Sequence, residues 1–60
     1  MVLNSTQRRV DTLIYIRALL EQLRAMAESE QFEMLAFLID MAQLEAREGL
    51  DRLLLLQRNE

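Results

Sequence analysis

The chain contains no cysteine, no histidine and no lysine among its 60 residues. The absence of cysteine excludes disulfide bonds and thiolate metal sites, and the absence of histidine leaves only carboxylates as ligands for zinc or iron. A domain of this size buries only about 60% of the surface that its unfolded chain exposes, so it needs disulfide bonds, a structural metal or a partner chain to fold stably. Because disulfide bonds and metal sites built from cysteine or histidine are excluded, we expect the chain to associate with itself, most simply as a homodimer.

Proline is also absent, and Gly49 is the only glycine. A strand-rich fold needs turn residues between short strands, so their scarcity argues against β-structure. Leu, Ala, Glu, Gln, Arg and Met dominate instead, and all of them favour helices. The sequence predicts an all-α fold with one domain over residues 1–60, an antiparallel helical hairpin with helices near residues 5–28 and 30–57. Gly49 is expected to end or kink the second helix.

The first helix is predicted to begin at Asn4-Ser5-Thr6, whose side chains suit an N-cap, and Ser29 is predicted to cap the second helix. A turn is expected near residues 28–31, although a single helix continuing through this point is the alternative. Between these signals the pattern is amphipathic. Its apolar seam comprises Leu13, Ile16, Leu20, Leu23 and Ala27, and its opposite, charged face comprises Arg17, Glu21, Arg24 and Glu28.

The second helix carries more apolar surface than one neighbouring helix can cover. Ten of the thirteen residues from Met34 to Ala46 are apolar, and at 100° per residue they span an arc of about 240°. The sequence therefore predicts that two hairpins pack as a four-helix bundle dimer. The predicted core comprises Leu13, Ile16, Leu20, Leu23, Leu35, Leu38, Ile39, Met41, Ala42 and Ala46. The predicted oligomer interface comprises Val10, Ile14, Met34, Phe37, Leu38, Met41, Leu44 and Leu55.

The residues offer little chemistry. Nucleophilic catalysis needs an activated Ser, Cys or Lys beside a base, whereas Ser5 and Ser29 lie where helix capping explains them. Glu45 falls on the apolar side of its helix, and a salt bridge to an arginine of the facing helix, for example Arg9, explains it better than a functional carboxylate does. We therefore predict no catalytic residue, no metal site and no cofactor, and a protein that is not an enzyme.

Ten acids against seven arginines give a net charge of −3. This balance disfavours binding to nucleic acid, where neutralised phosphates supply most of the affinity, and docking on anionic lipid. No apolar run approaches 18 residues, and the N-terminus lacks the pattern of a signal peptide. We expect a cytoplasmic protein without a nucleic-acid partner and without a membrane span.

Three stretches, Tyr15–Leu20, Leu23–Glu28 and Met34–Ala42, make the sequence resemble short, uncharacterised bacterial helical-hairpin proteins. The resemblance implies a bacterial source and carries no particular function.

Two functions fit these properties. The preferred hypothesis is a small homo-oligomeric adaptor or regulator that binds a helix of another protein in an apolar groove, with Val10, Ile14 and the Leu53–Leu56 tail as candidate contacts. The alternative is peripheral membrane association through that leucine-rich tail, which lacks the basic face that such helices use.

Overall fold

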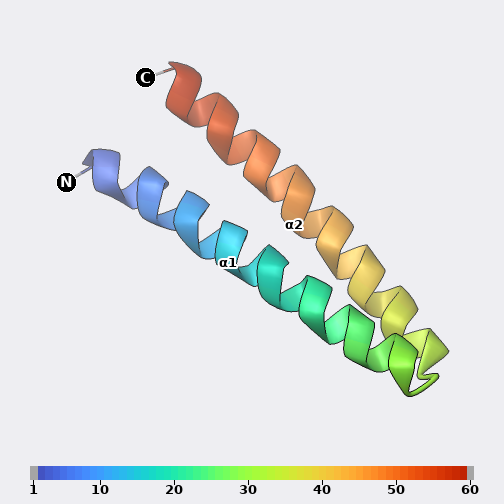
Figure 1. Cartoon of the computed structure of the whole chain (residues 1–60). Helices are drawn as coiled ribbons and strands as arrows, with labels where there is room; N and C mark the ends of the chain where they lie inside the picture. Colours follow the sequence, from blue (N-terminus) through green and yellow to red (C-terminus); the bar gives the residue numbers. More distant parts are fainter. Residues whose placement is uncertain (1, 60) are drawn as a thin grey trace.

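The protein is an antiparallel hairpin of two long helices. The computed structural model describes the backbone of residues 2–59 and the side chains of residues 5–58. Helix α1 runs over Val2–Ser29 and helix α2 over Glu33–Asn59, so that both ends of the chain lie at the same end of the molecule (Figure 1). The predicted all-α helical hairpin is confirmed, and a single continuous helix is ruled out. Helix α2 passes through Gly49 without interruption.

The turn between the helices is a Schellman motif built without glycine. The Phe32 N–H donates to the carbonyl of Ala27 at 2.8 Å, and the Gln31 N–H donates to the carbonyl of Glu28 at 2.9 Å. This pair of bonds requires a left-handed residue between the helix end and Phe32. Gln31 fills that position with a φ of 63°. The turn thus holds a non-glycine residue in a conformation that ordinarily favours glycine.

Two predicted caps are corrected. Ser29 does not cap α2 but is the last residue of α1, where its hydroxyl donates to the Met26 carbonyl at 2.9 Å. Phe32 precedes α2, and its carbonyl accepts the Ala36 N–H at 2.9 Å. At the other end, α1 begins at Val2, so the Asn4–Thr6 segment lies inside the helix and not at its cap.

The helices meet along a seam in which residues recur at alternating steps of three and four, the spacing of a coiled coil. Every seam residue is buried or partly buried. The seam comprises Thr6, Val10, Leu13, Arg17, Leu20, Arg24 and Ala27 in α1, and Ala36, Ile39, Gln43, Ala46, Leu50, Leu53 and Gln57 in α2.

Small and polar side chains make up much of this seam. Its buried cluster is Val10 with Leu50 and Leu53, against which Leu13 packs. The other buried apolar residues among those described are alanines, Ala27, Ala36 and Ala46. Val10, which the sequence placed at an oligomer surface, therefore lies in the core of the hairpin, only 4% exposed.

The predicted core is only partly inside the single hairpin. Ala46 is buried, and Leu13, Leu20 and Ile39 are partly buried. The remaining six members of that list are exposed, because the seam lies to one side of the apolar arc and not at its centre. These six are Ile16, Leu23, Leu35, Leu38, Met41 and Ala42.

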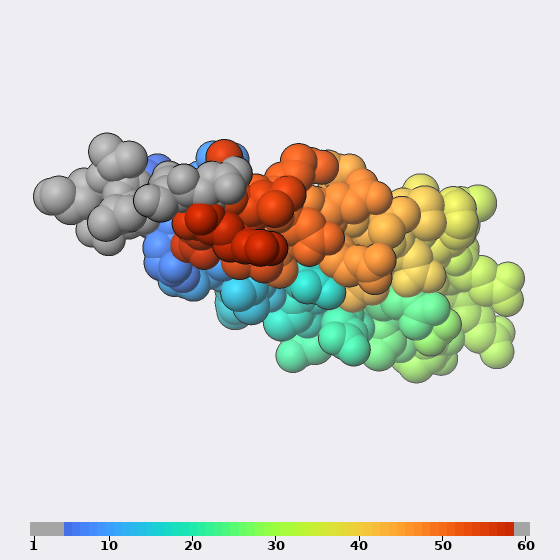
Figure 2. Space-filling view, turned by 90° about the horizontal axis from the view of Figure 1, so that it is seen from above, coloured from blue at the N-terminus to red at the C-terminus, as the bar shows by residue number. Residues whose placement is uncertain are grey.

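The hairpin is an elongated body of 44 × 15 × 10 Å, with the helices side by side along its length (Figure 2). Its radius of gyration is 14.0 Å, whereas a compact domain of 60 residues has a value of about 10 Å. Two packed helices are only one layer thick, so each side chain that points away from the seam faces outward.

Replacing Gln31 with glycine is expected to stabilise the fold. The left-handed conformation costs a non-glycine residue about 1–2 kcal/mol, and glycine removes this cost. Glycine also raises the conformational entropy of the unfolded chain, which offsets part of the stabilisation. We expect the free energy of unfolding to rise by up to about 1 kcal/mol, measured by urea titration at fixed protein concentration. Gln22→Gly, the same change inside α1, should instead destabilise by about 1 kcal/mol. Equal effects of the two changes would contradict the motif.

Candidate interaction surfaces

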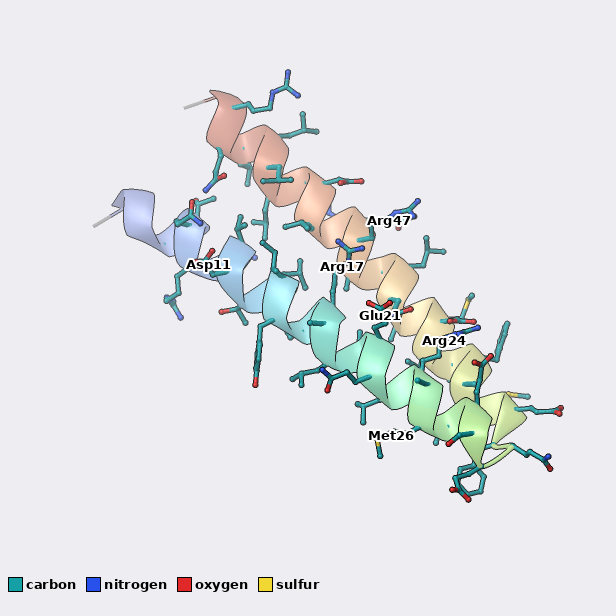
Figure 3. All side chains as sticks on the ribbon, viewed as in Figure 1. Asp11, Arg17, Glu21, Arg24, Met26 and Arg47 are labelled. Atoms are coloured by element: carbon teal, nitrogen blue, oxygen red, sulfur yellow. The ribbon has the colours of Figure 1, made fainter. Side chains whose placement is uncertain are left out.

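One side of the hairpin is an apolar face that both helices contribute to. Its residues follow the seam at neighbouring helical positions and remain between 39% and 62% exposed. We define the apolar face as Ile16, Leu19, Leu23 and Met26 in α1 with Leu35 and Leu38 in α2. Met26 projects from α1 away from α2 (Figure 3). No charged side chain belongs to this set.

The end of the apolar face near the turn is hollowed into an open groove of about 410 Å³. Leu23 and Met26 line it from α1, and Leu35 and Ile39 line it from α2. Phe32 closes it at the turn, and Glu30 is its one charged lining residue. The groove follows from the Schellman turn, which brings Phe32 back beside the end of α1.

The opposite side of the seam is charged. Arg17, Glu21 and Arg24 project from α1 on the side where Arg47 projects from α2 (Figure 3). Arg24 is ion-paired with Asp40 of α2, and its Nη2 lies 3.2 Å from Glu28 Oε2 in its own helix. The hydrogen bond and the charge of Asp40, followed by the charge of Glu28, raise the pKa of Arg24 above its ordinary value. Arg24 therefore stays protonated and joins the two helices.

A second apolar surface lies on α2 alone. Met34, Phe37, Met41 and Leu44 recur at steps of three, four and three along α2, outside the seam and away from the apolar face. They are 44–69% exposed. We call these four residues the outer stripe, and all of them belong to the predicted oligomer interface. Phe37 and Leu44 border the charged side, where they line hollows with Arg24 and Arg17 of α1.

The other predicted interface residues are scattered. Leu38 lies on the apolar face, and Leu55 follows the line of the outer stripe beyond Glu48. Ile14 lies on α1 at the border of the charged side. All three predicted residues are exposed. Sequence reasoning missed Leu19 and Met26 as members of one surface with Leu35, because the rotation of the helices was not known.

The structure corrects the role of Glu45. Its side chain is 75% exposed and its Oε2 lies 3.5 Å from Arg52 Nη2 in the same helix, so it is not buried against Arg9. In the part of the chain that is described, no three acidic side chains gather closely enough to hold a metal ion. No described helix is long and apolar enough to cross a bilayer.

No protein-family model matches the chain, and no curated protein and no solved structure is significantly similar to it. The fold and its surfaces therefore carry the functional argument.

Removing the interhelical ion pair should lower the melting temperature in a salt-dependent way. In Asp40→Asn, Arg24 loses the partner that joins α1 to α2, whereas Glu28→Gln removes only the contact within α1. We expect the larger loss for Asp40→Asn, measured by circular dichroism. The loss should shrink in about 1 M salt, where charges are screened beyond about 3 Å. A loss of equal size in both variants would show that the interhelical pair has no special role.

Proposed function

We propose that the protein is a non-enzymatic interaction module, a small helical adaptor or regulator that works as a homodimer. The observation that supports this proposal is the apolar face, a continuous set of large side chains on both helices, left open by a hairpin whose own core is small. A second copy packed on this face produces a four-helix bundle.

The position of the seam favours this assembly. In a four-helix bundle each helix contacts two neighbours, and its apolar arc points at the axis between them. The contact with the other helix of the same chain then lies at one edge of this apolar arc, and the contact with the second copy lies at the other edge. In α1 the seam includes Arg17 and Arg24 on its charged edge, while Ile16 and Leu23 lie on the opposite edge. That second edge is where the helices of another copy would pack.

The exposed area fits a second copy. A compact monomer of 7.1 kDa has an accessible surface of about 4100 Å². The hairpin exposes 4931 Å², an excess of about 850 Å² over that expectation. Each partner of a standard-size protein interface buries about 800 Å². One partner of similar size is therefore enough to bring the exposed surface of this chain to the normal range.

The energies point the same way. Covering a half-exposed leucine contributes on the order of 1 kcal/mol, so the apolar faces of two copies contribute on the order of 10 kcal/mol together. Association costs about 4–15 kcal/mol in lost freedom. The two terms are of similar size, so a dimer that dissociates on dilution is expected.

Peripheral membrane association is the other candidate that the sequence raised. Helices that lie on a bilayer flank their apolar side with lysine and arginine. The apolar face is flanked by charges of both signs instead: Glu30 at the groove, Arg9 beside Ile16 and the pair of Glu45 with Arg52 on α2. These charges favour a protein partner over an anionic bilayer.

Light scattering across a dilution series tests the dimer. We expect a molar mass of about 14 kDa, twice the 7.1 kDa of one chain, that falls on dilution together with the helical signal. Leu23→Gln with Leu35→Gln should shift both transitions to higher concentration, because each change removes apolar contact area. Tyr15→Gln, which changes a large exposed residue on the outside of α1, should leave them in place.

A chain that stays fully helical at 7.1 kDa down to micromolar concentration would refute the dimer. So would a dimer that tolerates the double substitution unchanged.

A further inference from the structure

A dimer built on the apolar face leaves the outer stripe uncovered, because that stripe lies on α2 outside the seam and away from the apolar face. We propose that the outer stripe is a docking surface for an amphipathic helix of another protein, one whose apolar side is flanked by arginine or lysine. The proposal builds on the dimer only in that the dimer must leave this stripe free.

The spacing of the stripe suits a helix as its occupant. Met34, Phe37, Met41 and Leu44 span eleven residues, or about 15 Å of helix, which presents almost three turns of apolar side chains in one line. A helix that docks on a helical surface contacts it through apolar side chains that also recur at steps of three and four residues. The two methionines repack easily around such anchors. One aromatic residue, Phe37, provides the large contact that dominates many interfaces.

Charge selects the kind of helix. Glu33, Glu48 and Asp51 border the stripe or its continuation along α2, and Arg47 lies beside its Leu44 end. Within residues 5–58 none of these four side chains forms an ion pair, so the acids outnumber the cation. Glu45, by contrast, is held by Arg52. A basic helix placed on the stripe would meet acids that lack a partner in the chain. An acidic helix would be repelled there.

Charge gives a second copy little advantage on this surface. Two stripes that pack antiparallel bring Glu33 of one chain near both Arg47 and Glu48 of the other, one opposite charge and one like charge. In the proposed dimer the apolar face already serves self-association, which leaves the outer stripe for a different protein.

Two labelled peptides provide the probe. Each is roughly 18 residues, about five turns, with leucines on one side; one carries lysines on the other side and its match carries glutamates. By fluorescence anisotropy, we expect the lysine peptide to bind the full chain and the glutamate peptide to bind at least about tenfold more weakly. Raising the salt concentration should weaken the binding of the lysine peptide more strongly than that of the glutamate peptide.

The binding surface is located by substitution. Phe37→Gln with Met41→Gln should weaken the lysine peptide about tenfold or more, because both anchors are lost. Glu33→Gln with Glu48→Gln should weaken it less and reduce the dependence on salt. Tyr15→Gln is the matched control on α1 and should change nothing. Light scattering should give wild-type molar mass for every variant, which separates this test from that of the dimer.

Four results would overturn the inference. The lysine peptide does not bind, or both peptides bind equally. The Phe37 and Met41 substitutions dissociate the dimer, which would assign the stripe to self-association. The fourth is that the chain binds vesicles of phosphatidylcholine and phosphatidylglycerol and that the Phe37 and Met41 substitutions abolish this binding, which would assign the stripe to lipid.

Discussion

The contact between α1 and α2 constrains everything else in this molecule. It is a coiled-coil seam whose buried part consists of Val10, Leu50, Leu53 and three alanines. Its partly buried members include two arginines and two glutamines. Such a seam holds two helices together but buries little apolar area. The large side chains of the chain must therefore lie outside the seam. From that one fact follow the apolar face and the outer stripe, which are the basis for the partners that we propose.

Polar pairs along the seam connect the two helices near both of its ends. The ion pair of Arg24 with Asp40 near the turn, and the hydrogen bond from Gln57 to Gln7 at 2.7 Å near the open end, lie at opposite ends of the contact. Exposed or half-exposed pairs of this kind add little stability. Polar groups at seam positions can instead fix register, because any other alignment separates the partners. Both pairs lie along the charged side of the contact, opposite the apolar face.

The sequence alone predicted the helical hairpin, because strong helix formers and the lack of proline leave no other regular structure. It located the turn within a few residues but not its chemistry, since a Schellman motif usually shows a glycine and this one uses Gln31. It also predicted that apolar surface would remain uncovered. It did not predict which residues lie at the seam. An apolar arc predicts that the residues at its centre are buried, whereas the seam residues Val10 and Arg24 lie at the edge of the arc. That edge depends on the rotation of two helices, which a one-dimensional pattern does not contain.

The two surfaces differ in the charges around them, which is why we propose different partners for them. The apolar face is shared by both helices and has no charged member, as the self-complementary interface of the proposed twofold dimer requires. The outer stripe belongs to α2 alone and is bordered by more acids than cations, which suits the basic helix that we propose for it. A twofold dimer displays every uncovered surface twice. The proposed bundle would therefore present two identical docking stripes on one rigid body, and a partner that is itself paired would bind it far more tightly than one stripe allows.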